Sequence, residues 1–244
     1  LCTASAKTPF SLNNSENNWI QQTGKLKVGI DPDRDPISFK GSDGTFQGIG
    51  PDYLQLVAEI AGIEIEYVDE PWPLLLDKAS QGQIDILPAI DYNHSRDASL
   101  QFSNVYESFP VALFSLQKGP YINDLSQLNG HKVAVFSNYT LIERLHKDYP
   151  QITLVAVKSI KEGLRMVQNR RVDFYVGSLL TTGNAIYKLG ISDIKVAGET
   201  PYRLDLQMAV PASSTELHSI LNKALSSIPE KKRIGILSKW SHLN

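Results

Sequence analysis

From residue 26 onward, the apolar positions of the chain alternate between two spacings. Runs of consecutive or alternating apolar residues at 26–30, 64–68 and 84–89 are typical of strands. Between the first two runs, the apolar residues of 51–61 recur at helical spacing, and Gly62 follows as a helix terminator. This alternation of strands and helices predicts an α/β fold.

The same order of elements appears a second time further along the chain. Residues 132–135 predict a strand, 140–148 a helix and 152–157 another strand. A helix capped by Ser159 and a strand over 171–176 complete the series. Such units can resemble one another by chance, but here both order and spacing agree over consecutive elements. The repeat therefore predicts two similar α/β lobes.

The C-terminal part of the chain predicts how the two lobes are connected. A strand over 206–210 precedes a helix with an apolar face over 217–228 and a last helix that starts at Pro229. No strand follows these helices, so they must pack on an earlier lobe, most simply the first. The chain then crosses between lobes near 116–120 and near 202–206, which makes a hinge and a ligand-binding cleft. The predicted boundaries are 25–116 with 205–244 for the first lobe and 117–204 for the second.

Residues 1–24 are expected to lie outside both lobes. Thr3–Ala6 resembles the small-residue tail of a secretory signal peptide, although a remnant of an expression vector explains it equally well. The first interpretation places the protein in the periplasm or outside the cell. The polar stretch 7–24 is expected to be a loosely packed linker, with one short helical turn around Trp19.

Composition changes this picture mainly by exclusion. The chain has 42% hydrophobic and 20% charged residues, and no apolar run approaches the length of about 20 residues needed for a membrane span. Its 24 basic and 26 acidic residues argue against a nucleic-acid partner, which would favour a basic surface. The single cysteine, Cys2, excludes an internal disulfide and a cysteine-based metal site.

Catalytic motifs are not found in the sequence. It contains no nucleophile elbow, no phosphate-binding loop and no paired histidines at the spacing of a helical metal site. Gly48 and Gly50 resemble part of a dinucleotide-binding loop, but the third glycine is missing and a turn before a helix explains both. Asp31, Asp33 and Asp35 are typical of an acidic turn. We therefore predict no catalytic residues, no metal site and no cofactor, and hence a protein that is not an enzyme.

Several longer segments follow one another in an order that is informative as a series. They are Leu26–Asp31, Gly44–Gly48, Gly82–Asp85, Ser95–Arg96, Phe102–Tyr106, Leu125–Val133 and Ile236–Trp240. The series resembles the family 3 bacterial solute-binding proteins, the Venus-flytrap receptors for polar amino acids, from Trp19 to Trp240. The resemblance implies a periplasmic-binding-protein-like (type II) flytrap with two lobes and two crossovers between them.

A narrower resemblance is to the periplasmic flytrap domains of membrane sensors, the BvgS-like hybrid histidine kinases. It rests on 48–54, 85–89 and 174–179, and on Trp19 and Ile20 before the first strand. It implies a non-catalytic sensor domain that binds a small polar metabolite, such as an amino acid or carboxylate, and relays closure to a transmembrane and cytoplasmic signalling module. Two alternatives are a free periplasmic binding protein of an ABC transporter and a flytrap-fold enzyme such as cyclohexadienyl dehydratase. A homodimer is left open.

The resemblance also assigns roles to single residues. Arg96 is expected to donate two parallel hydrogen bonds to a ligand carboxylate. Asp91 stands where the family has threonine or serine, and would repel an anionic ligand group or pair with Arg96. Ser178 replaces the aspartate that binds the ligand's ammonium group, whereas Asp31 keeps a family position at the mouth of the cleft for a cationic group. Arg34 replaces the aromatic lid residue. These departures predict that simple α-amino acids bind poorly.

The remaining expected contacts are aromatic groups and a helix terminus. Either Trp72 or Tyr92 would supply the stacking contact that Arg34 weakens, although Trp72 fits better as a core residue under its own helix. Phe136, Tyr139 and Thr140 match the positions that close over the ligand at a helix N-terminus, where backbone N–H groups can bind an anion.

Overall fold

The computed structural model describes residues 9–93, 96, 98–137 and 140–240, and the chain forms two compact units. Among the described residues, the first unit comprises those up to Glu107 and those from Leu206 to Trp240, and the second comprises those of Ser108–Asp205. Strand β8 (Glu107–Leu116) thus belongs almost entirely to the second unit, whereas the sequence pattern suggested a crossing after residue 116. The reason is its antiparallel pairing with a strand of that unit, in which Phe114 lies opposite Tyr175.

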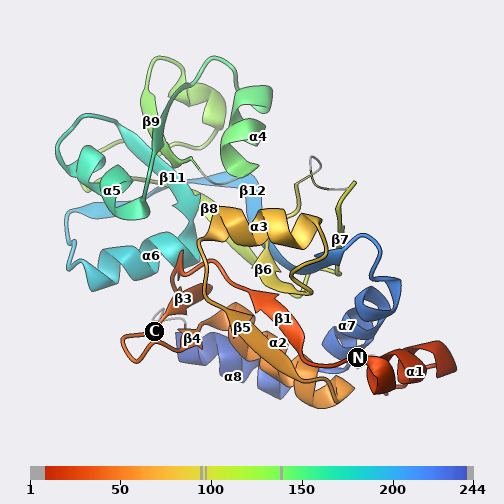
Figure 1. The fold of residues 1–244 in the computed structure, drawn as a ribbon. Helices are drawn as coiled ribbons and strands as arrows, with labels where there is room; N and C mark the ends of the chain where they lie inside the picture. Colours follow the sequence, from red (N-terminus) through yellow and green to blue (C-terminus); the bar gives the residue numbers. More distant parts are fainter. Residues whose placement is uncertain (1–8, 94–95, 97, 138–139, 241–244) are drawn as a thin grey trace, which may run out of the picture. The chain divides into compact units, whose positions relative to one another are not determined.

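In the first unit, two parallel strands and several helices surround the core (Figure 1). β1 pairs in parallel with β5, and a bridge between Val28 and Ile86 joins β1 to the segment that leads into β6. The C-terminal helices α7 and α8 both pack on α2 of this unit. The elements are α1 (Asn14–Gln22), β1 (Leu26–Gly29), β2 (Asp33–Arg34), β3 (Ser38–Lys40), β4 (Phe46–Gln47), α2 (Ile49–Ala61), β5 (Ile65–Val68), α3 (Trp72–Ser80), β6 (Leu87–Ile90), β7 (Leu100–Phe102), α7 (Thr215–Ser227) and α8 (Glu230–Trp240).

Helix α2 shows why the sequence folds as predicted at this point. Gly62 ends the helix in the left-handed conformation, with φ of 71°, and its N–H donates to Ala58 O. At the other end, Gly48 has φ of 126°, and a Cβ atom there would lie 2.5 Å from Ile37 O. Only glycine fits this approach. Gly48 of the Gly48-x-Gly50 motif therefore belongs to the turn before the helix, whereas Gly50 already lies in the first turn of α2.

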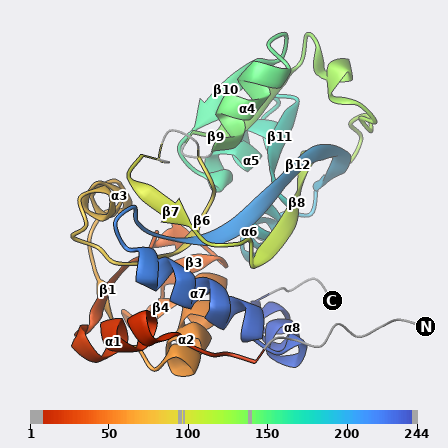
Figure 2. The same ribbon diagram turned by 90° about the vertical axis from the view of Figure 1, so that its right-hand side faces the viewer.

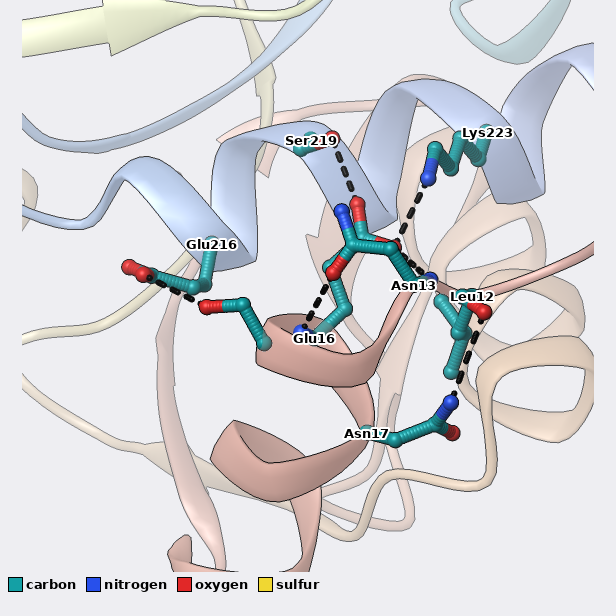
Figure 3. A network of polar contacts seen from close by, with 8 residues as sticks. Leu12, Asn13, Glu16, Asn17, Glu216, Ser219 and Lys223 are labelled. Carbon is teal, nitrogen blue, oxygen red and sulfur yellow. Dashed lines mark hydrogen bonds and ion pairs between the residues drawn. The ribbon is translucent and has the colours of Figure 1, made fainter.

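Helix α1 is more ordered than the single turn expected around Trp19. Asn13 Oδ1 accepts the N–H of Glu16 at 2.9 Å, and Glu16 Oε2 accepts the N–H of Asn13 at 2.7 Å. Glu16 is 2% exposed and also contacts Ser219 and Lys223 of α7, each at 2.7 Å (Figure 3). Although burial opposes its charge, the bond from Lys223 and the other donors keep the pKa of Glu16 below its usual value. This capping box and its docking fix the helix beside α7 (Figure 2).

The second unit is built on a sheet with β9 between β10 and β11, all parallel, and β8 antiparallel to β11. Helices α5 and α6 pack on β11, and a core cluster that includes Ala134, Leu164 and Tyr175 lies among these elements. The predicted repeat of strands and helices is present here. The elements are β8, the 3-10 helix η2 (Leu125–Leu128), β9 (Lys132–Phe136), α4 (Thr140–Asp148), β10 (Thr153–Val157), α5 (Ile160–Gln168), β11 (Phe174–Ser178), α6 (Leu179–Lys188) and the first part of β12 (Ile194–Pro211).

Strand β12 is far longer than the predicted strand over 206–210. It has 18 residues and passes from the second unit into the first, where it pairs with β6 and β7. Buried Tyr202, Leu204 and Leu206 alternate with more exposed neighbours, which is the pattern of a half-buried strand. Within the described part of the chain, no helix is both long enough and apolar enough to cross a membrane.

Candidate functional site

Two carboxylates follow neighbouring parallel segments of the first unit. Asp31 comes shortly after β1 and Asp91 directly after β6. The two segments are joined by the bridge between Val28 and Ile86 and by a hydrogen bond from Gly29 N to Ile86 O at 3.0 Å. Open α/β sheets bind ligands at the carboxyl ends of their strands, so both acids stand where a ligand site is expected.

Arg34 is the counter-charge of Asp91 in this unit. Its Nη2 donates to Asp91 Oδ1 at 2.5 Å, and its Nη1 lies 3.4 Å from Ala89 O. The Arg34 side chain is 6% exposed and that of Asp91 is 20% exposed, so the ion pair is largely buried. The resemblance implies that Asp91 either repels an anionic ligand group or pairs with Arg96, and that Arg34 replaces an aromatic lid residue. The structure places Arg34 in a buried position against Asp91, and a pairing of Asp91 with Arg96 stays a prediction.

Asp31 is the second acidic group next to this pair. Its Oδ1 accepts the N–H of Asp33 at 3.1 Å, and its backbone oxygen accepts the Ser38 hydroxyl at 2.7 Å. Burial raises the pKa of Asp31 above its usual value, and the positive charge of Arg34 opposes this rise. Arg34 thus faces two carboxylates, and the electrostatic balance at these strand ends favours a further positive charge.

The structure also gives the positions of the other predicted residues of the first unit, Arg96, Tyr92 and Trp72. Arg96 is half-buried, and its backbone is held in a turn by hydrogen bonds of 3.0 Å with Asn93 and with Ser99. Tyr92 is 39% exposed and meets Phe102 edge-on at 5.2 Å. Trp72, the first residue of α3, is half-buried against a core cluster, which agrees with its interpretation as a core residue. Ligand contacts by these side chains stay predictions.

The predicted residues of the second unit lie at the ends of two strands. Ser178 ends β11 and caps α6, because its Oγ accepts the N–H of Leu180 at 3.2 Å. Its hydroxyl is 3% exposed and so has a structural task besides the predicted contact with a ligand. Phe136 ends β9 and Thr140 begins α4, and both are half-buried. Tyr139 lies outside the described residues.

Sequence reasoning missed two groups of polar side chains near these strand ends. Thr181 and Thr182 of α6 carry buried hydroxyl oxygens with no hydrogen-bond partner among the described residues. Tyr106 is buried, and its hydroxyl donates to Pro88 O at 2.7 Å, which fixes the backbone just before Asp91. Tyr106 closes one of the segments that carried the family resemblance, whereas nothing local marks the two threonines.

Side chains that could bind a metal ion form no cluster in the described residues, which contain no group of three or more His, Cys, Asp or Glu side chains that could hold one. What the first unit does contain is a buried ion pair with a second carboxylate beside it. This arrangement can bind a charged or polar group by hydrogen bonds and Coulomb attraction.

Two α/β units joined by two passages of the chain, with charged side chains at strand ends, define an extracytoplasmic binding protein of the periplasmic-binding-protein fold. Residues 26–242 match the family described as bacterial extracellular solute-binding proteins, family 3. The chain belongs to this family, which confirms the resemblance seen in its sequence.

Two of the similar proteins are sensors. The chain is 27% identical to the virulence sensor protein BvgS of Bordetella pertussis over 92% of its own length and 18% of that protein. It is 26% identical to the sensor protein EvgS of Escherichia coli over 95% of its length and 19% of that protein. The chain therefore spans about a fifth of these relatives. The crystal structure of the periplasmic VFT2 domain of Bordetella pertussis BvgS is similar to it with a TM-score of 0.85 and 26% identity, covering 94% of this chain and 99% of that one.

Proposed function

We propose that this chain is a periplasmic, non-catalytic ligand-binding domain of a membrane sensor, which signals to a histidine kinase module. The observation that carries the proposal is the match to the BvgS VFT2 domain over nearly the full length of both chains. Ligand binding would act by shifting the population of conformations of the domain. The proposal includes two further features, namely that the domain is tethered to the membrane and that it is attached to the kinase module.

The proposed ligand is a small polar molecule with a positively charged group, such as an amine. Asp31 and Asp91 supply two carboxylates, and Arg34 already forms an ion pair with one of them. A simple α-amino acid is expected to bind weakly, because Arg34 is committed to Asp91 and Ser178 brings no charge for the amino group. Arg96 is proposed to bind a polar or anionic part of the same ligand.

A thermal-shift screen tests this proposal with three sets of compounds: polyamines, carboxylates and ordinary amino acids. We expect the largest rise in melting temperature with the polyamines and little or none with the ordinary amino acids. Arg96→Ala should abolish the rise, whereas Lys158→Ala, a change at an exposed lysine of the second unit, should leave it intact. Strong stabilisation by an ordinary amino acid would contradict the proposed ligand class, and unchanged affinity in Arg96→Ala would place the site elsewhere.

The family itself favours one alternative, a free binding protein of an ABC transporter. The full-length gene distinguishes the two. A membrane span of about 20 residues followed by a kinase module supports the sensor, whereas a chain encoded beside a permease and without such a span supports the transporter. The flytrap-fold enzyme is tested by incubating the purified protein with prephenate or arogenate, and we expect no turnover.

A further inference from the structure

The β2–β3 hairpin, residues 33–40, carries different side chains on its two faces. Arg34 lies opposite Ser38, and Asp33 lies opposite Phe39. Successive side chains of a strand point to opposite faces, so Arg34 and Ser38 share one face while Asp33 and Phe39 share the other. Burial agrees with this division, because Arg34 and Ser38 are buried, Phe39 is half-buried and Asp33 is exposed. If the hairpin moves together with Arg34, Phe39 must therefore move as well.

Phe39 contacts the end of the last helix. Its ring meets that of Trp240 edge-on, with centroids 5.4 Å apart and planes at 86°. Trp240 Nε1 donates to Asp52 Oδ2 at 2.7 Å, and Lys239 Nζ lies 2.8 Å from the same oxygen. Asp52 belongs to the first turn of α2. The end of α8 is thus held between the hairpin on one side and the start of α2 on the other.

The connection between the hairpin and α2 leaves little room for independent movement. Ile49 N donates to Pro36 O at 3.0 Å, and Gly50 N donates to Ile37 O at 2.9 Å. A Cβ atom on Gly50 would lie 2.6 Å from the Cβ of Ala89, whose carbonyl oxygen faces Arg34. The start of α2, the hairpin and the end of β6 are therefore in close contact, and close-packed groups transmit displacement.

We propose that the β2–β3 hairpin couples the Arg34–Asp91 ion pair to Trp240 at the end of α8. A ligand group that competes for Arg34 or Asp91 weakens the ion pair that holds the Arg34 face of the hairpin in place. The hairpin then moves, and Phe39 on its other face moves relative to the indole ring of Trp240. The inference rests on the proposed function, since it takes the ion pair as the element on which a ligand acts. Because coupling is reciprocal, a change at Trp240 must also alter the surroundings of Arg34.

Tryptophan fluorescence tests the coupling without any ligand. The chain has three tryptophans, so Trp19→Phe and Trp72→Phe leave Trp240 as the only reporter. In this background, Asp91→Asn removes the negative charge of the ion pair and Arg34→Gln removes the positive charge. We expect Trp240 emission to shift to longer wavelength and its quenching by acrylamide to increase, because the released hairpin withdraws Phe39 from the ring.

A matched control lies on the same hairpin. Lys40 forms an ion pair with Asp69, and the two side chains are 40% and 62% exposed, so Asp69→Asn removes a solvent-exposed ion pair of the same hairpin. This change should leave the emission and quenching of Trp240 as they are in the background protein. An equal shift in Asp69→Asn would overturn the proposal, as would folded Asp91→Asn and Arg34→Gln proteins, judged by far-UV circular dichroism, with unchanged Trp240 fluorescence.

A second measurement reads the coupling in the other direction and keeps the ion pair intact. Phe39→Leu should shift the side-chain Nε–H resonance of Arg34 in nitrogen-15 NMR, whereas Lys40→Gln should not. An unmoved Arg34 resonance in Phe39→Leu would overturn the coupling even where the ion-pair variants fail to fold. Neither experiment uses a ligand, so a failed ligand screen and a failed coupling test are separate results.

Discussion

The two units present chemically different groups at the ends of their strands. In the first unit, charged groups dominate: Arg34 and Asp91 form a buried ion pair, and Asp31 has a raised pKa beside them. In the second unit, the described candidate residues at strand ends are neutral, with Ser178 capping a helix and the hydroxyl of Thr182 buried. The difference teaches that the candidate residues of the first unit are charged and paired, whereas those of the second unit are neutral hydrogen-bonding groups.

The largest effect is expected from breaking the ion pair of the first unit. Asp91→Ala removes the carboxylate that is hydrogen-bonded to the buried Arg34 guanidinium, and we expect a loss of about 3–5 kcal/mol in the free energy of unfolding. Urea denaturation measures the loss. The double variant Arg34→Met/Asp91→Leu should recover most of it, because neither charge then remains buried.

The exposed pair of Lys40 and Asp69 is the control for this prediction. Its side chains are 40% and 62% exposed, so Lys40→Ala should cost no more than about 1 kcal/mol. If Asp91→Ala and Lys40→Ala lowered the free energy of unfolding by the same small amount, the buried ion pair would not stabilise the first unit more than an exposed one. The contrast with the second unit would then fail.

A smaller effect is expected from the neutral groups of the second unit. Ser178→Ala removes the cap of α6 and should lower the free energy of unfolding by about 0.5–2 kcal/mol. Thr182→Val is the matched comparison, since its hydroxyl oxygen has no hydrogen-bond partner among the described residues, and replacement by a methyl group should be neutral or stabilising. Urea denaturation of both variants sharpens the contrast, and a larger loss in Thr182→Val would assign the hydroxyl a bond that it lacks here.

The smallest effect concerns Asp31 and depends on pH. Because burial raises its pKa in the folded protein, folding favours the protonated form, and stability decreases as pH rises from the ordinary value of 3.8 through the raised one. Asp31→Asn should therefore be more stable than the wild type near neutral pH, and the difference should vanish as pH falls below 3.8. Thermal unfolding across this range provides the measurement, and a wild type that gained stability relative to Asp31→Asn with rising pH would show that its carboxylate is stabilised by folding.

Much of the fold follows from local signals in the sequence, and the exceptions have physical causes. Helix α4 begins and ends at the predicted residues, and α2 ends at the glycine that predicted its end. Helix α1 was underestimated because its apolar content is low, while its real signal is the Asn13-x-x-Glu16 capping box. Strand β12 is longer than predicted because only its most apolar part, 206–210, has the pattern of a buried strand, whereas buried and more exposed residues alternate before it.

The candidate site was less predictable because it depends on pairing between distant residues. The sequence indicated Arg34, Asp91 and Asp31 as site residues, but Arg34 and Asp91 are separated by 57 positions. Their contact requires the register of β2 against β3 and the placement of both beside β6. Helix and strand periodicity contains no information on such a register, so the partner of Asp91 could not be derived from it.

The position of α7 and α8 has a consequence for the order in which the chain can fold. Both helices pack on α2, yet they follow the whole second unit, Ser108–Asp205, in the sequence. During synthesis, α2 therefore emerges long before the helices that cover it, and the second unit is complete before they appear. A chain stalled after residue 205 would expose an apolar surface on α2 that α7 and α8 normally cover.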